Sequence, residues 1–172
     1  MNENEVVKEV FLAAQINDQA YLSKLLTENA DLANQENDVG LTLLGYAAHF
    51  GQTESVKILL KFGADVNALS HSKLSFIPSN TALHAAIAGE RNLEVIELLL
   101  EHGAKTTIMD SNGHSCLHTA AYHDDNTEII HRLLQYGAQV EQKGPDGKTA
   151  LDLTIEQGHK QVEKTLRQSV QS

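Results

Sequence analysis

The sequence predicts an all-α fold, a solenoid of about five stacked helix-turn-helix repeats with short β-turn or hairpin loops. Two short motifs predict it, because each recurs at a nearly fixed interval and the two stay in step. The segments between them place apolar residues at the spacing of a half-buried helix. The composition agrees, because aromatic residues make up only 5% of the chain and its apolar supply is Leu, Ile, Val and Ala.

The first motif is a hydroxyl residue followed by Leu two positions later. It begins at Thr42, Thr81, Ser115 and Thr149, which are 39, 34 and 34 residues apart. A hydroxyl side chain can accept a main-chain N–H in the first turn of a helix, so each of these residues is predicted to be an N-cap. Small residues follow that let neighbouring helices approach closely: the pairs Ala47-Ala48, Ala85-Ala86 and Ala120-Ala121.

The second motif follows the amphipathic second helix of each repeat. Asn29, Gly63, Gly103 and Gly137 each precede an Ala, and they are 34, 40 and 34 residues apart. The three glycines fall where a helix can end on a left-handed residue. Both motifs are lengthened in the same repeat, which indicates one insertion there. A single repeat cannot bury its apolar face, so we expect one domain over residues 1–172, with units at about 5–36, 37–69, 70–109, 110–143 and 144–168.

These motifs resemble those of the ankyrin-repeat family. Thr81-Ala82-Leu83-His84-Ala85-Ala86 is similar to the family signature Thr-Pro-Leu-His-x-Ala, and Gly63-Ala64-Asp65-Val66-Asn67-Ala68 is similar to its closing segment. The resemblance covers about residues 5–168. It implies that the chain binds another protein through a concave face of loops and first helices. It also implies structural histidines at His84 and His118, hydrogen-bonded to the loop and to the motif hydroxyl.

The chain departs from the family pattern at its ends and in one loop. The first unit lacks the motif, and the last has Asp152 where His is usual, as expected of capping repeats. The third unit has six extra residues in the loop before its motif. The segment Ser70–Asn80 in this loop includes Leu74, Phe76 and Ile77, which are unusual in a solvated loop. These side chains either fold back on the groove or contact a partner.

The chain carries a net charge of −10, and residues 1–40 alone hold eight acidic and two basic residues. Such a surface repels phosphate, so no direct nucleic-acid partner is expected. The acidity serves solubility, or it attracts a basic protein partner to the N-terminal end. One cysteine, no signal-peptide pattern and no apolar run of about 18 residues predict a cytoplasmic protein without a membrane span. Capping repeats at both ends favour a monomer.

Three clusters were candidates for chemistry. His114, His118 and His123 fall within ten residues and give the alternative prediction, a metal-binding or enzymatic protein, but no Cys or second His cluster completes four ligands. Cys116 and His118 are two residues apart, so they do not face each other on a helix. A few acids suggest a cation site but fit helix-start residues better: Asp124, Asp125 and Glu128. The favoured prediction is therefore no enzyme, no metal and no cofactor.

The predicted partner-binding residues lie, by the resemblance, in the loops and on the first helices. They are Asp38, Val39, Leu41, Tyr46, His49, Phe50, Phe76, Ile77, Ser111, Asn112, His114, Tyr122, His123, Asp146 and Lys148. Phe50 and Tyr122 lead this set because exposed aromatic side chains are typical binding hot spots. Phe50 has the alternative of packing on the loop of the adjacent repeat. The segment ending at Asn67 also resembles the context that an asparagine hydroxylase modifies in animal ankyrin proteins.

Overall fold

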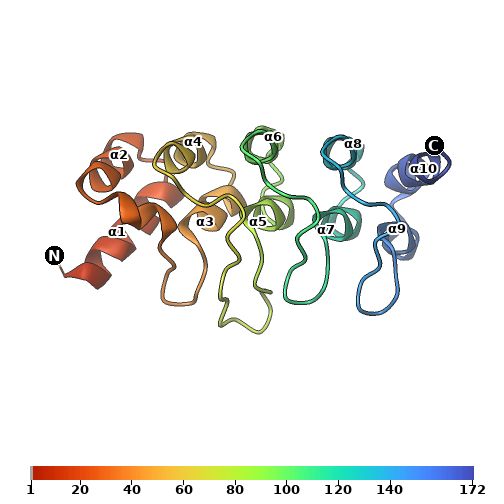
Figure 1. The fold of residues 1–172 in the computed structure, drawn as a ribbon, viewed down its shortest axis with the longest axis horizontal. Coiled ribbons are helices and arrows are strands. Elements are labelled where there is room, and N and C mark those ends of the chain that lie inside the picture. The colour runs from red at the N-terminus through yellow and green to blue at the C-terminus, as the bar shows by residue number, and fades with distance from the viewer. Residues whose placement is uncertain (1) are drawn as a thin grey trace. The chain divides into compact units, whose positions relative to one another are not determined.

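The computed structural model describes residues 2–172, and they form helices and loops as predicted (Figure 1). The chain divides into two compact units, the first ending at Ala104 and the second beginning at Lys105. The first unit holds α1 (Glu3–Gln15), α2 (Gln19–Glu28), the 3-10 helix η1 (Ala30–Asn34), α3 (Leu43–His49), α4 (Thr53–Lys61), α5 (Ala82–Ala88) and α6 (Leu93–Glu101). The second holds α7 (Cys116–His123), α8 (Thr127–Gln135), α9 (Ala150–Gln157) and α10 (Lys160–Val170).

Within each unit the helices pair in chain order and the pairs stack. In the first unit α1, α3 and α5 form one row and α2, α4 and α6 form another (Figure 1). In the second unit α7 packs on α9, and α8 packs on α10. These five helix pairs confirm the predicted class, an all-α repeat fold of about five helix-turn-helix units. No helix within residues 2–172 is long and apolar enough to cross a membrane.

The core of each unit consists of aliphatic side chains that the helical spacing placed on one face. Burial of each such side chain contributes roughly 1.5–3 kcal/mol. The largest fully buried ones are Leu22, Leu26, Leu43, Leu59, Leu83, Ile87, Ile96 and Leu99 in the first unit, and Leu117, Ile129, Ile130 and Leu133 in the second. Small residues let the first helices approach one another. A Cβ added to Gly45 on α3 would lie 3.8 Å from the Cβ of Ala85 on α5.

The predicted helix caps are confirmed. The side-chain oxygens of Thr42, Thr81, Ser115 and Thr149 each accept the main-chain N–H three residues later. Each such cap contributes about 1 kcal/mol. The glycines of the second motif, at positions 63, 103 and 137, have φ angles of +85°, +89° and +88°. An L side chain adopts this region only with strain, which explains why glycine ends these helices.

Two second helices receive their cap from the preceding helix pair. Asn17 follows α1, and its side-chain oxygen accepts the main-chain N–H of Ser55 on α4 at 3.0 Å. Asp125 follows α7, and its carboxylate accepts the main-chain N–H of Val162 on α10 at 2.8 Å. Neither α4 nor α10 has a cap from its own N-cap side chain. These bonds therefore join one helix pair to the next within each unit.

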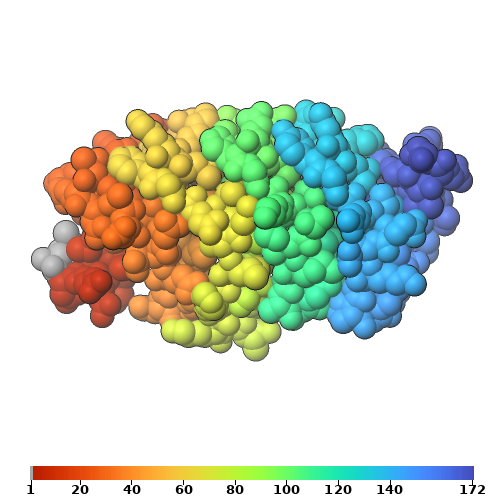
Figure 2. All heavy atoms as spheres, viewed as in Figure 1, coloured from red at the N-terminus to blue at the C-terminus, as the bar shows by residue number. Residues whose placement is uncertain are grey.

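The inserted loop, residues 70–80, packs on the loop before it. The main-chain N–H of His71 donates to the carbonyl oxygen of Gly40 at 2.9 Å. That of Lys73 donates to the carbonyl oxygen of Val39 at 3.0 Å. Figure 2 shows the yellow-green inserted loop lying against the orange loop of the preceding repeat. The main chain of the insertion is thus held in place, rather than being free in solvent.

Candidate protein-binding surface

Four aromatic rings of the first unit contact one another in series: Phe11, Tyr46, Phe50 and His49. Tyr46 and His49 lie on α3, where the rest of the helix is Leu, Gly and Ala, and Phe50 is the residue that directly follows this helix. The ring centroids of Phe11 and Tyr46 are 5.3 Å apart, those of Tyr46 and Phe50 are 5.0 Å apart, and those of His49 and Phe50 are 5.3 Å apart. All three pairs meet edge to face, a favourable aromatic geometry. Phe50 is half-buried against these rings of its own helix, while His49 is exposed.

The loop before α3 carries the next predicted residues, Asp38, Val39 and Leu41. The side-chain oxygen of Asn37 accepts the N–H of Val39 at 3.2 Å and that of Leu41 at 3.0 Å. Gly40 completes the turn with a φ of +80°. Asp38 is exposed, and Val39 and Leu41 are half-buried. The loop is therefore fixed by its own hydrogen bonds before any partner arrives.

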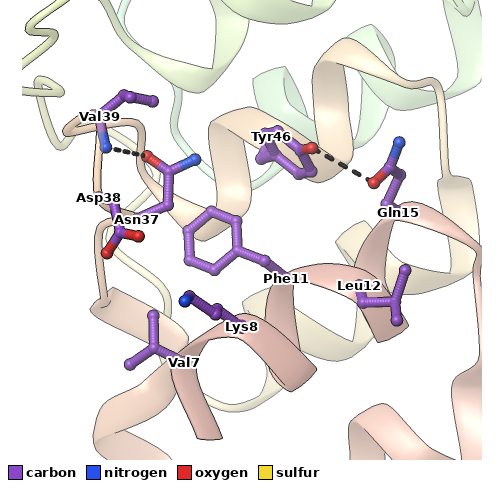
Figure 3. Close-up of a pocket in the computed structure, with 9 residues that line it drawn as sticks. All are labelled: Val7, Lys8, Phe11, Leu12, Gln15, Asn37, Asp38, Val39 and Tyr46. Atoms are coloured by element: carbon purple, nitrogen blue, oxygen red, sulfur yellow. Dashed lines mark hydrogen bonds between the residues drawn. The ribbon is translucent and has the colours of Figure 1, made fainter. Parts of the chain in front are cut away.

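A groove of about 300 Å³ lies between this loop, α3 and α1 (Figure 3). Three predicted residues line it together: Asp38, Val39 and Tyr46. The remaining lining residues are Val7, Lys8, Phe11, Leu12, Gln15 and Asn37. The Tyr46 hydroxyl donates to the side-chain oxygen of Gln15 at 3.2 Å, which links α3 to α1 across the groove.

The contact residues predicted from the sequence include none of the α1 residues that line this groove. Leu12 lines the groove and is 50% exposed, and Ile16 at the end of α1 is 61% exposed. The missing signal was the pair Ala13-Ala14, which corresponds to Ala47-Ala48 on α3 when the two repeats are aligned by their period. That alignment places Leu12 and Ile16 at the positions of Tyr46 and Phe50.

The tip of the inserted loop presents an apolar side chain. Phe76 is 78% exposed, whereas Ile77 is half-buried. The main-chain N–H of Ile77 donates to the carbonyl oxygen of Leu74 at 3.2 Å and closes a tight turn. The predicted alternatives concerned the apolar side chains of this loop: Leu74 and Ile77 are half-buried, while the Phe76 ring remains accessible.

The second unit carries its predicted residues on two loops and on α7. Ser111 and Asn112 are exposed in the loop before α7. Tyr122 on α7 is 53% exposed, and its ring meets that of His123 edge to face at 5.3 Å. In the loop before α9, the ammonium of Lys148 lies 3.8 Å from the carboxylate of Asp146.

Lys148 also forms a shorter ion pair, with Glu156 on α9 at 2.6 Å. This hydrogen bond raises the pKa of Lys148. The side chain is exposed to solvent, so the pair orients the ammonium group rather than adding much stability.

The buried histidines have the structural role that the resemblance implied. The Nδ1 atom of His84 lies 2.9 Å from the Thr81 hydroxyl, and that of His118 lies 2.8 Å from the Ser115 hydroxyl. The Nε2 atom of His118 lies 3.0 Å from the carbonyl oxygen of Lys148 in the next loop. Burial lowers the pKa of His118, which favours the neutral ring.

The metal-binding alternative gains no support from these positions. The ring centroids of His114 and His118 are 5.7 Å apart, and both ring nitrogens of His118 already have partners in the protein. Among the described residues, no three His, Cys, Asp or Glu side chains are placed to hold a metal ion. Asp125 caps α10 instead, and Cys116 is fully buried in the second unit.

Comparison with known proteins gives the same family. A family model described as ankyrin repeats (3 copies) matches residues 10–110 and 88–171. Inversin from Gallus gallus is 35% identical over 97 residues, 56% of this chain and 8% of inversin. The serine/threonine-protein kinase VIK from Arabidopsis thaliana is 41% identical over 90 residues, 52% of this chain and 19% of the kinase. A putative ankyrin repeat protein from Rickettsia bellii is 38% identical over 91 residues, 52% of this chain and 35% of that protein.

The matched part therefore spans only a fraction of the length of each of these relatives. The family assignment rests on the repeat itself, since the two matched ranges of the family model together cover most of the chain. Ankyrin repeats are in general protein-interaction modules. The motifs, the helix pairs and the matched model agree, and the chain belongs to the ankyrin-repeat family.

Proposed function

We propose that this chain is a protein-binding module that recognises a protein partner through its loops and the exposed faces of its first helices, and that it carries out no catalytic step. The observation that carries the proposal is the set of exposed or half-buried rings on the first helices or at their ends: Tyr46, Phe50 and Tyr122. The aromatic and hydrogen-bonded contacts of these rings and loops keep them ordered before binding, which lowers the entropic cost of association.

The proposed contact residues are those predicted from the sequence, extended by Leu12 and Ile16. We further propose that residues 1–172 act as one monomeric domain in the cytoplasm, and that a basic surface on the partner complements the acidic N-terminal unit.

Affinity capture from an extract of the source cells tests the function. The full chain is immobilised, and the captured proteins are compared with those held by a double variant, Phe50→Ala with Tyr122→Ala. The matched control is Phe62→Ala with Tyr136→Ala, because these residues follow the second helices α4 and α8. Both double variants remove one Phe and one Tyr, so a loss of capture that comes only from the smaller apolar surface would appear in both.

The expected result is that captured partners are lost with the first double variant and retained with the control. Circular dichroism of all three proteins checks that the helices are intact. Equal capture by the wild type and by the Phe50 and Tyr122 variant would show that these residues do not form the binding surface.

A further inference from the structure

The groove beside α1 is a surface that no repeat motif accounts for. Five of its nine lining residues have aliphatic or aromatic side chains: Val7, Phe11, Leu12, Val39 and Tyr46 (Figure 3). Its volume of about 300 Å³ is at the lower end of the range for ligand pockets. That space suits one or two large apolar side chains of a partner rather than a bulky cofactor.

The apolar surface continues along two neighbouring helices of the first unit. Leu12 and Ile16 are one helical turn apart on α1, which is about 6 Å, and both are at least half exposed. Tyr46 and Phe50 are one turn apart on α3, with ring centroids 5.0 Å from each other. Two such pairs on adjacent helices match the apolar face of an amphipathic helix, whose anchors recur every third or fourth residue.

The net negative charge of the first unit favours a basic partner. Residues up to Ala104 include 14 acidic and 6 basic residues, a net charge of −8, whereas residues from Lys105 include 9 and 7, a net charge of −2. A net negative unit attracts a basic partner over distances of about 10 Å.

Charged groups at the groove refine this preference. Asp38 is exposed at the edge of the groove. The hydrogen bonds marked among the lining residues join other groups and do not involve its carboxylate (Figure 3). Two ammonium groups, of Lys8 and Lys73, offset part of the negative charge there. The Lys73 ammonium already donates to the main-chain oxygen of Asp38 at 3.0 Å. The exposed Asp38 carboxylate is therefore an acceptor at the groove that a basic side chain of the partner can reach.

We infer that this groove binds a basic amphipathic helix of a partner protein, with one bulky apolar side chain in the groove and a Lys or Arg beside Asp38. The inference rests on the proposed protein-binding function and names the partner's chemistry. It assigns Leu12 and Ile16, in the repeat that lacks the motif, as contact residues of this helix.

Selection from a phage-displayed library of random peptides tests the inference. The full chain is immobilised, and the enriched peptides are sequenced, synthesised with a fluorescent label and titrated by fluorescence anisotropy. The expected peptides combine large apolar residues at helical spacing with an excess of Lys and Arg. Enrichment of acidic peptides, or no enrichment, would overturn the inference.

Paired variants locate the binding site of the enriched peptide. Leu12→Ala and Asp38→Lys are each expected to weaken binding about tenfold. The matched controls are Ile155→Ala, an apolar side chain on α9 that is 44% exposed, and Asp31→Lys, an exposed acid of η1 that does not line the groove. These controls are expected to change the affinity less than about twofold. Equal losses in the test and control variants would place the peptide elsewhere.

The groove inference can fail while the proposed protein-binding function stands. Partners captured from an extract that require Phe50 and Tyr122, but neither Leu12 nor Asp38, would refute the groove inference and leave the protein-binding function standing. Capture that is indifferent to all four residues would refute both.

Discussion

Gly40 is the position where a single methyl group should most damage the first unit. Its φ of +80° is left-handed, and a Cβ there would overlap the main-chain oxygen of His71 and lie 2.6 Å from its carbonyl carbon. Real Cβ atoms do not approach other heavy atoms so closely, and main chain cannot rotate away as a flexible side chain can. The Gly40→Ala protein must therefore separate the two loops.

The cost has two parts. Alanine in the left-handed region costs roughly 1–2 kcal/mol. Separating the loops breaks the hydrogen bonds that His71 and Lys73 donate to Gly40 and Val39, at about 1 kcal/mol each. Gly40→Ala should therefore lower the free energy of unfolding by about 3–4 kcal/mol, a large share of the stability of a small domain.

Two other loop glycines are matched controls with nearly the same φ. Gly147, at +79°, has no heavy atom within 4 Å of the added Cβ, and Gly113, at +80°, has the Pro145 ring at 3.1 Å. Gly147→Ala should cost only the conformational part, and Gly113→Ala slightly more. Urea unfolding followed by circular dichroism measures all three. If Gly40→Ala and Gly147→Ala lose equal stability, the contact between the two loops is not the reason for glycine at position 40.

The pKa of His118, the cap of α10 and the net charge of the first unit each give a further prediction. Because burial lowers the pKa of His118 in the folded chain, the unfolded chain binds the proton more tightly, so stability should fall as the pH drops below about 6.5. Urea unfolding across this pH range should show a shallower pH dependence of stability for His118→Gln. An unchanged slope would contradict the assignment of this pH dependence to His118. Asp125→Ala should cost about 1–2 kcal/mol because α10 loses the cap at Val162, whereas Glu141→Ala, an exposed acid of the same unit, should be nearly neutral in the same assay. Affinity for a basic partner should fall as salt rises, measured by titration at several salt concentrations, and salt-independent binding would argue against an electrostatic contribution.

The features that depend on local chemistry could be predicted from the sequence. The N-caps at Thr42, Thr81, Ser115 and Thr149 and the left-handed glycines are set by a few neighbouring residues, so their motif predicted the helices and their ends. The same holds for the histidines of the motif, which lie three residues from the hydroxyl that they contact.

Which of the candidate residues lie together depends on tertiary packing and could not be predicted. Asp38, Val39 and Tyr46 were predicted, but the groove they share is completed by Leu12 on α1, whose repeat lacks the motif. The inserted loop docks through main-chain hydrogen bonds and through the contact of His71 with Glu36, 35 residues earlier in the chain, and the repeat motifs mark neither. Caps such as that of Asp125 on α10 join residues 37 positions apart. Such contacts depend on how helix pairs stack, and the spacing of residues within one repeat does not encode them.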